Sequence, residues 1–267
     1  HASVRHTMTP GLTARLARIG TAGRYLVVPM DHGITLGPVT GLIELERTVE
    51  AICANGADAV LTHAGVADRV LPQTHGAGFI VHLNGSTAIG PDEDDKRQTA
   101  TVPAAIRAGA DAVSFHMNVG SPYEPDQMTQ LSAVIEEAHR FGLPVLAMSY
   151  ARGPGIDETD PTALAHAVRL AAELGADLIK TGYSGDPESY REVTRATQRP
   201  VVIAGGARGS DTETLEMVAG AMTAGAAGVS MGRSIFQHPD PGAITAAIAA
   251  VIHDDALPAA AADAAGL

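Results

Sequence analysis

The stretch Gly175–Gly182 reads Gly-Ala-Asp-Leu-Ile-Lys-Thr-Gly, and the chain carries three more versions of this phrase. Gly56–His63 reads Gly-Ala-Asp-Ala-Val-Leu-Thr-His, Gly109–His116 reads Gly-Ala-Asp-Ala-Val-Ser-Phe-His, and Gly225–Gly232 reads Gly-Ala-Ala-Gly-Val-Ser-Met-Gly. Each copy follows an alanine-rich amphipathic run that is typical of a helix. The first glycine is typical of a helix C-cap with φ > 0, and the apolar run after it predicts a buried strand.

Four further apolar runs complete the set of predicted strands: Tyr25–Met30, Phe79–His82, Val145–Tyr150 and Val201–Ala204. Helical patterns separate the strands, near Glu44–Ala54, Asp95–Ala108, Asp126–Phe141, Pro161–Leu174, Pro187–Thr197, Asp211–Thr223 and Pro239–His253. Eight apolar strands alternating with helices predict an α/β fold, a closed (β/α)8 TIM barrel. The alternative is an open doubly wound sheet. However, no Gly-x-Gly-x-x-Gly follows the first strand, where a dinucleotide-binding fold carries it.

The two ends of the chain are expected to add to this pattern. An extra N-terminal helix near Leu12–Ile19 is expected to cover the bottom of the barrel. From Ala256 the sequence is mostly alanine, which predicts a frayed helix or a disordered tail over residues 256–267. Residues 1–3 have neither a start Met nor an apolar signal core and are left out of the fold prediction. Because a TIM barrel commonly fills about 250 residues, we expect a single domain over residues 4–255.

The composition excludes several classes of function. The formal net charge of −12 argues against a nucleic-acid surface, which needs clustered basic residues. No apolar stretch approaches the roughly 20 residues that cross a bilayer. Cys53 is the only cysteine, so no internal disulfide can form and a reducing compartment, the cytoplasm, is expected. We therefore expect small-molecule substrates, and neither nucleic acid nor membrane as a partner.

Polar residues follow or end the predicted strands, at the edge where TIM-barrel enzymes carry out their chemistry. In chain order they are Asp31-His32, His63, His82, His116, Tyr150, Lys180, Gly205-Gly206 and Gly232-Arg233. Packing does not explain a ring of polar residues on an otherwise apolar scaffold, so this ring predicts the active site.

Lys180 is the most informative member of that ring. The chain has only two lysines, and this one directly follows the apolar residues Leu178-Ile179. Desolvation lowers the pKa of a lysine at the end of a buried strand, which makes it a candidate nucleophile that forms a Schiff base with a carbonyl. The alternative is a structural lysine that reaches past the barrel rim to solvent or to a carboxylate.

Tyr150 and Asp31 are the candidate acid–base groups. The strand of Tyr150 neighbours that of Lys180, so its phenol can exchange a proton with a carbinolamine or an aldol oxygen. Asp31 follows a run of apolar residues and can accept a substrate proton or hold the lysine in place. The structural alternatives are a tyrosine hydrogen-bonded to a loop and a carboxylate that caps the turn before Gly33.

A phosphate site is expected at the ends of the last two strands. Barrel enzymes often bind phosphate there with backbone N–H groups and a short helix. Gly205-Gly206 and Gly232-Arg233 occupy these positions, and the guanidinium of Arg233 can add a charge-assisted contact. The alternative is that these glycines serve only the turns of the barrel. That alternative explains one of the two glycine pairs but not both.

Three histidines, His63, His82 and His116, end neighbouring strands and could together bind Zn²⁺. No tight His-x-His spacing supports a metal, so neutral hydrogen-bonding histidines that line a polar pocket are preferred, with His116 as a substrate contact. The acidic run Asp92–Lys96 is interpreted as a solvated loop that leads into a helix.

Together these residues resemble the archaeal-type class I aldolases of the DeoC/FbaB/LacD group. The resemblance covers nearly all of the chain from about Tyr25 to His253. It rests on Pro29-Met-Asp-His-Gly33, Gly37-Pro-Val-Thr-Gly-Leu42, His82-Leu83, Gly109-Ala-Asp-Ala-Val-Ser114, Asn118-Val-Gly120, Lys180-Thr181, Ala204-Gly-Gly206 and Gly232-Arg-Ser-Ile-Phe-Gln-His238.

The resemblance implies a role for each of these residues. Lys180 is implied to be the Schiff-base lysine, Tyr150 the proton donor and Asp31 the proton acceptor. The implied substrate contacts are His32, Gly33, Ile34, Thr35, Tyr150, Ala151 and Arg152, and the implied phosphate contacts are Gly205, Gly206, Gly232 and Arg233. No cofactor and no metal are implied, because the substrate is held as a covalent imine on Lys180. The family further implies a homo-oligomer, often a ring of five or ten.

Within that family, the chain is most similar to enzymes that join a phosphorylated ketose-derived donor to L-aspartate semialdehyde. The product is a seven-carbon amino ketose for aromatic or aminohydroxybenzoate biosynthesis. One alternative uses dihydroxyacetone phosphate as the donor. Another is a fructose-1,6-bisphosphate aldolase, which would carry Trp where this chain has Met148. Ala151 and His63-Ala64-Gly65 also depart from the common pattern, since a Pro and a basic residue are usual there. A metal-dependent lyase and a non-enzymatic scaffold are the more distant alternatives.

Overall fold

Eight parallel strands form a closed barrel in the computed structural model, which describes residues 9–206 and 209–267. The barrel strands are β1 (Tyr25–Pro29), β2 (Ala59–His63), β3 (Gly78–His82), β6 (Ala112–Val119), β7 (Val145–Ala151), β8 (Leu178–Thr181), β9 (Val201–Ala204) and β10 (Gly228–Ser230). They pair in the order β1-β10-β9-β8-β7-β6-β3-β2. This closed order confirms the predicted (β/α)8 barrel and rules out the open doubly wound sheet.

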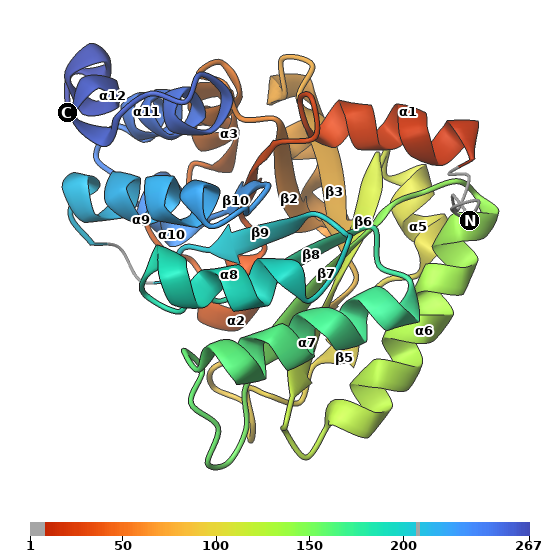
Figure 1. Ribbon diagram of the computed structural model, residues 1–267. Coiled ribbons are helices and arrows are strands. Elements are labelled where there is room, and N and C mark those ends of the chain that lie inside the picture. The colour runs from red at the N-terminus through yellow and green to blue at the C-terminus, as the bar shows by residue number, and fades with distance from the viewer. Residues whose placement is uncertain (1–8, 207–208) are drawn as a thin grey trace.

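Helices surround the strands, as Figure 1 shows for α6, α7, α8 and α9. The helices are α1 (Pro10–Ile19), α2 (His32–Leu36), α3 (Leu45–Cys53), α4 (Ala67–Val70), α5 (Val102–Arg107), α6 (Glu124–Arg140), α7 (Pro161–Leu174), α8 (Pro187–Arg195), α9 (Asp211–Thr223), α10 (Arg233–Phe236), α11 (Pro241–His253) and α12 (Pro258–Ala265). Two short 3₁₀ turns, Ala64–Val66 and Leu71–Gln73, flank α4. In the described part of the chain, no helix is long and apolar enough to span a membrane.

Alternation along each strand divides the apolar residues into two cores. Side chains that face inward form a small cluster in the barrel that includes Val27, Leu61, Ile80, Leu146 and Leu178. The residues between them face outward and pack against the helices in a much larger cluster. A polar residue on the inward face, beyond the apolar layer, therefore points into the mouth of the barrel.

The repeated phrase has a structural meaning for its glycine and its aspartate. The four opening glycines all have positive φ, between 89° and 103°, as expected of helix C-caps. In the first three copies the aspartate carboxylate accepts a backbone N–H from the preceding barrel strand. Asp58 accepts from Leu26 at 2.7 Å, Asp111 from Phe79 at 3.0 Å and Asp177 from Val145 at 2.9 Å. The phrase therefore marks where each strand is tied to its neighbour.

Helix α1 covers the end of the barrel where the strands begin, as predicted. Its last residue, Ile19, is fully buried and belongs to the inner cluster with Tyr25, Ile80 and Ala112. The backbone of α1 approaches β3 so closely that a Cβ at Gly78 would lie 2.4 Å from the carbonyl oxygen of Arg18. This end is therefore closed, and the opposite end of the barrel is left for a site.

Two segments differ from the sequence prediction. Helix α5 begins at Val102 and not near Asp95, because Thr101 caps it by accepting the N–H of Ala104. The residues before it form a small antiparallel pair, β4 (Asn84–Gly85) with β5 (Arg97–Gln98). The alanine-rich tail, for which a frayed helix or disorder was expected, forms helix α12, and Ala261 buries itself against the core.

Candidate active site

Strand alternation places Lys180 inside the barrel mouth. Leu178 belongs to the inner cluster and Ile179 to the outer one, so Lys180 faces inward again. Its neighbours in the sheet are Met148 of β7 and Val202 of β9. The residue is only 6% exposed, and no carboxylate in the described part of the chain lies within 4.0 Å of its ammonium group. Lys180 is therefore a buried amine without an ion-pair partner, which does not fit the alternative of a structural lysine.

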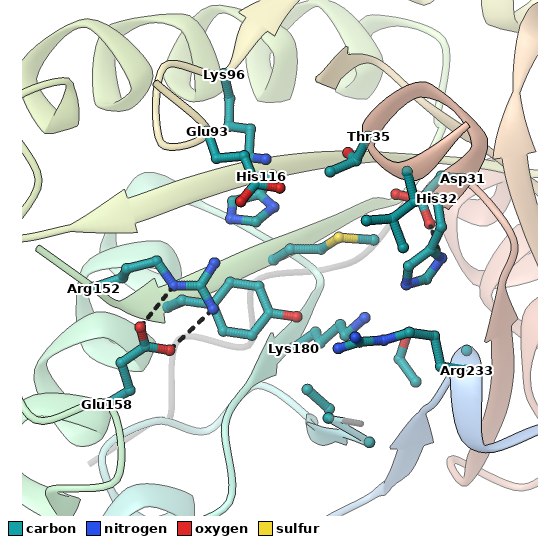
Figure 2. Close-up of a pocket in the computed structure, with 18 of the residues that line it drawn as sticks. Asp31, His32, Thr35, Glu93, Lys96, His116, Arg152, Glu158, Lys180 and Arg233 are labelled. Atoms are coloured by element: carbon teal, nitrogen blue, oxygen red, sulfur yellow. Dashed lines mark hydrogen bonds and ion pairs between the residues drawn. The ribbon is translucent and has the colours of Figure 1, made fainter. Parts of the chain in front are cut away.

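A pocket of about 630 Å³ opens above Lys180 (Figure 2). It brings together most of the predicted site residues, namely Asp31, His32, Thr35, His116, Tyr150, Arg152, Lys180, Gly205, Gly206, Gly232 and Arg233. These residues come from the C-terminal ends of six strands and from the segments that follow them. Residues that lie far apart in the sequence thus meet around a single cavity.

Three of the predicted substrate contacts do not line this pocket. Gly33 and Ile34 belong to helix α2, and the Ile34 side chain is partly exposed to solvent. Ala151 is buried in the outer core, because it follows the inward-facing Tyr150 on β7. The Ala151 side chain therefore faces the helices, and only its backbone lies near the barrel mouth.

Asp31 lies at the start of helix α2 but does not cap it, since its carboxylate makes no hydrogen bond to the helix N–H groups. Its oxygens lie 3.5 Å from His32 Nδ1 and 3.8 Å from His82 Nε2. Burial alone would raise the pKa of Asp31. Attraction to His82, His32 and Lys180 outweighs that effect, so the pKa is well below its ordinary value. Asp31 is thus held ionised and faces the pocket.

His82 is a buried neutral histidine below Asp31. Burial lowers its pKa to about 3, so the ring is uncharged at neutral pH. Its Nδ1 lies 2.7 Å from the hydroxyl of Ser114, and its ring meets that of His63 edge to face at 5.4 Å. His82 therefore lies next to the Asp31 carboxylate but does not line the cavity.

Tyr150 is fixed from two sides. The ring of His116 packs against it with centroids 5.0 Å apart, and the guanidinium of Arg152 lies over it at 5.1 Å. Arg152 in turn donates two hydrogen bonds of 3.0 Å to Glu158. These contacts hold the phenol in one place on the pocket wall, as an acid–base group requires.

His116 lines the pocket as a neutral, hydrogen-bonded histidine. Its Nε2 lies 2.7 Å from Oδ1 of Asn118, whose Nδ2 donates to Asp94. Because that amide oxygen can only accept, we assign the proton of the neutral ring to Nε2 and leave Nδ1 free to accept. Burial lowers the pKa of His116 well below its ordinary value, and the nearby charge of Lys96 adds to this effect.

The glycine pairs at the ends of β9 and β10 have steric reasons of their own. A Cβ at Gly205 would lie 2.9 Å from Met231, and one at Gly232 would lie 2.6 Å from the carbonyl oxygen of Pro29. Gly206 has a φ of +64°. Packing and backbone conformation therefore account for both pairs, contrary to our expectation that they account for only one. Arg233 lines the same wall of the pocket, and its charge remains the feature that indicates an anion site there.

The three histidines do not converge as a metal site. His63 and His82 contact each other, whereas His116 lies against Tyr150 on another part of the rim. Across residues 9–206 and 209–267, no group of three or more His, Cys, Asp or Glu side chains is arranged to hold a metal ion. The described side chains thus provide no ligand set for the metal-dependent alternative.

Sequence reasoning missed several pocket residues, namely Leu36, Glu93, Asp94, Lys96, Glu158, Ala204 and Ser230. The interpretation of Asp92–Lys96 as a solvated run is wrong for its last residue, because Lys96 is only 8% exposed and lines the pocket. The scarcity of lysine was a usable signal, since both lysines of the chain lie in this cavity. The Ser230 hydroxyl is buried here without a hydrogen-bond partner among the described residues.

Comparison with known proteins agrees with this geometry. Residues 25–238 match the model of the DeoC/LacD family aldolases. The chain is 62% identical to 2-amino-3,7-dideoxy-D-threo-hept-6-ulosonate synthase of Halobacterium salinarum, over 96% of this chain and 97% of that one. It is 43% identical to 2-amino-4,5-dihydroxy-6-oxo-7-(phosphonooxy)heptanoate synthase of Streptomyces griseus, over 86% and 85%.

A solved structure extends the likeness to the fold. An archaeal fructose-1,6-bisphosphate aldolase, with its catalytic Lys covalently bound to the carbinolamine intermediate of the substrate, superposes with a TM-score of 0.81. The two share 29% identity, and the alignment covers 90% of this chain and 99% of that one. The barrel, the pocket at its C-terminal edge and these relatives lead to one conclusion: this chain is an enzyme of the DeoC/LacD family of aldolases.

Proposed function

We propose that this enzyme is a class I aldolase that joins a phosphorylated ketose-derived donor to L-aspartate semialdehyde through an imine on Lys180. The observation that carries the proposal is the meeting of Lys180, Asp31 and Tyr150 in one pocket. The 62% identity to a hept-6-ulosonate synthase supports the choice of substrates.

Lys180 supplies the nucleophile. Its nitrogen adds to the donor carbonyl carbon to give a carbinolamine, and loss of water then gives the imine. The protonated imine draws the electron pair of the breaking carbon–carbon bond into an enamine, while the other fragment leaves as a carbonyl compound. The enamine carbon attacks the aldehyde carbon of the acceptor, and water finally releases the seven-carbon amino ketose from Lys180.

Asp31 and Tyr150 move the protons. The low pKa of Asp31 keeps its carboxylate ionised before the reaction, so the carboxylate can accept a proton from the substrate. Tyr150, one strand away from Lys180, gives a proton to the aldehyde oxygen as the new bond forms. No metal or organic cofactor is needed in this scheme, because the imine itself stabilises the carbanion.

Arg233 and the backbone N–H groups of Gly205, Gly206 and Gly232 bind the donor phosphate. They lie on the β9–β10 side of the pocket, next to the strand of Lys180. The hydroxyl of Ser230 has no hydrogen-bond partner among the described residues, so it is available to a donor hydroxyl on the same side. The donor is thereby held with its carbonyl toward Lys180 and its anion away from it.

A second candidate differs only in the donor. The 43% identity to the Streptomyces griseus synthase favours an enzyme that condenses dihydroxyacetone phosphate with aspartate semialdehyde. Fructose-1,6-bisphosphate as the substrate is disfavoured by Met148, which lines the pocket beside Lys180 where Trp was expected for that activity. The proposal also includes a role in aromatic or aminohydroxybenzoate biosynthesis, a cytoplasmic location and a homo-oligomer, with a ring of five or ten as its expected form.

Borohydride trapping tests the proposal. Incubation with the deoxyhexodiulose phosphate donor and borohydride should add the reduced donor fragment to the peptide that contains Lys180, and K180M should prevent this. Parallel condensation assays with this donor and with dihydroxyacetone phosphate separate the two candidates. Absence of an adduct, or loss of activity on chelation, would contradict the imine mechanism.

A further inference from the structure

Lys96 is a buried cation that the reaction described above does not use. It lies between β4 and β5, and its ammonium donates to the hydroxyl of Ser86 at 2.7 Å. It is only 8% exposed, and no carboxylate in the described part of the chain lies within 4.0 Å of its nitrogen. A buried ammonium with one neutral partner is unfavourable unless an anion joins it.

The loop that carries Lys96 is fixed to the barrel. Gln127 Nε2 donates to the carbonyl of Asp94 at 2.7 Å, and Asn118 Nδ2 donates to its carboxylate at 3.1 Å. The hydroxyl of Ser86 donates to the carbonyl of Glu93 at 2.6 Å. Lys96 is therefore held against the end of β6, and its position is not that of a free surface side chain.

Lys96 and the proposed phosphate anchor lie on different sides of the pocket. Lys96 is placed with His116 and Arg152, at the ends of β6 and β7, whereas Arg233 follows β10. The strand of Lys180 lies between β7 and β9. Figure 2 shows Lys96 beside His116 and Arg233 reaching toward Lys180 from another part of the pocket. Basic side chains thus lie on both sides of the nucleophile, and the carboxylates of Glu93, Asp94 and Glu158 also line the pocket.

Arg152 alone does not provide the positive charge on the Lys96 side of the pocket. Its guanidinium is already engaged by both oxygens of Glu158. Lys96 has no carboxylate within 4.0 Å among the residues that the structure describes. Burial lowers the pKa of Lys96, Glu93 opposes that shift and the nearby Arg152 adds to it. An anion bound between the two cations would relieve both effects.

We propose that Lys96, together with Arg152, binds the carboxylate of the aldehyde acceptor and so selects an amino-acid semialdehyde. The inference rests on the proposed function, because it assumes that the donor occupies Lys180 and the β9–β10 side. The acceptor then has to approach from the β6–β7 side. Tyr150 lies near the end of β7 and Arg152 directly follows that strand, two residues further on, or roughly 6–7 Å along an extended chain. An acceptor whose oxygen meets Tyr150 can therefore extend its carboxylate toward Arg152 and Lys96.

Two acceptors isolate the carboxylate. 4-Oxobutanoate is aspartate semialdehyde without the amino group, and butanal has the same carbon chain without the carboxylate. In the wild-type enzyme, kcat/KM should be higher for 4-oxobutanoate. K96M should lower kcat/KM for 4-oxobutanoate by about 10- to 100-fold, the range for hydrogen bonds to charged groups, and leave butanal nearly unchanged. K96R should restore part of the preference. R97M removes a neighbouring exposed cation, which pairs with Asp95, and should leave both values unchanged.

The donor provides the second readout. Borohydride trapping and the KM for the phosphorylated donor should be the same in K96M and in the wild type. An equal loss for both acceptors would show that Lys96 has a structural role only. A raised donor KM or weaker trapping would show that Lys96 binds the donor phosphate. Either result would overturn the proposal.

Binding of an inert acceptor analogue separates this inference from the imine chemistry. L-Homoserine carries the carboxylate and the ammonium of aspartate semialdehyde but has no aldehyde. Titration calorimetry should detect its binding to the wild type and to K180M, and the affinity should fall about 10- to 100-fold in K96M. If trapping fails in the wild type, the proposed function is wrong whatever this titration gives. If K96M binds L-homoserine as well as the wild type does, the Lys96 inference is wrong even when trapping succeeds.

Discussion

The guanidinium of Arg152 lies over the ring of Tyr150, 5.1 Å from its centroid. The same arginine is held by Glu158, and the other neighbour of the ring is His116. A cation above an aromatic ring contributes about 0.5–2 kcal/mol and depends on the ring but not on its hydroxyl. The contacts that position Tyr150 therefore involve its ring, whereas its hydroxyl would transfer the proton. The hydroxyl can be removed without loss of these ring contacts.

Replacing Tyr150 by Phe should remove the proton donor and keep the position of the ring. We expect kcat to fall by about 10²- to 10⁴-fold, the usual contribution of a positioned acid or base. Borohydride should still label Lys180, since the amine remains. Steady-state kinetics beside trapping checks this. An unchanged kcat in Y150F would remove the phenol from the reaction.

Replacing Arg233 by Met should weaken binding of the phosphorylated donor. The loss of one charge-assisted contact predicts a donor KM that is about 10- to 100-fold higher, with the acceptor KM unchanged. R140M, on the exposed surface of α6, serves as the control. A donor analogue without phosphate should bind R233M and the wild type equally. If R233M also weakens binding of that analogue, Arg233 is not the phosphate contact.

Asp177 tests the tie between strands. Its buried carboxylate accepts the N–H of Val145 at 2.9 Å and contacts His139 Nε2 at 2.8 Å. D177A leaves that N–H without a partner, so the free energy of unfolding should fall by about 2–4 kcal/mol. Urea denaturation measures the change. D263A, on the exposed face of α12, should stay within about 0.5 kcal/mol of the wild type, and an equally small effect of D177A would contradict the prediction.

Stability should decline as the pH falls below the ordinary histidine range. Burial lowers the pKa of His82 to about 3 in the folded chain, while about 6.5 applies to the unfolded chain. Between these values only the unfolded state binds the proton, so the free energy of unfolding falls by about 1.4 kcal/mol per pH unit for such a histidine. H82N should make this slope shallower, whereas H166Q, at an exposed position on α7, should not. Denaturation at several pH values gives both slopes.

The barrel itself could be predicted because its signals are local. Each copy of the phrase brings a capping glycine next to an apolar run, and Gly56, Gly109, Gly175 and Gly225 all have the expected positive φ. Inward-facing residues at the strand ends, such as Tyr150 and Lys180, follow from the strand positions alone. Local pattern therefore predicts the inner wall of the pocket.

The outer wall depends on contacts between distant segments. Lys96 reaches the pocket because two-residue strands fold its loop back and because Asn118 and Gln127 hold that loop. Neither the short pairing nor these side-chain bonds has a periodic signature. Glu158 likewise enters the site through its bonds to Arg152. The need for glycine at positions 205 and 232 also arises from neighbouring segments, because a Cβ there would meet Met231 or Pro29. The sequence of one strand alone therefore does not predict it.

The aspartate ties have a consequence for how the chain folds. Each joins residues 32 positions apart, in the pairs Leu26–Asp58, Phe79–Asp111 and Val145–Asp177. The entropy lost on closing a loop depends on its length, so the three βαβ pieces close at nearly the same entropic cost. In the fourth copy Ala227 stands in place of the aspartate, and its N–H donates to the carbonyl of Val201. The barrel thus contains three strand pairs, each joined by an aspartate contact of the same sequence separation. If the chain were cut between two pairs, for example at the turn at Gly142 before β7, both residues of each aspartate contact would remain in the same fragment.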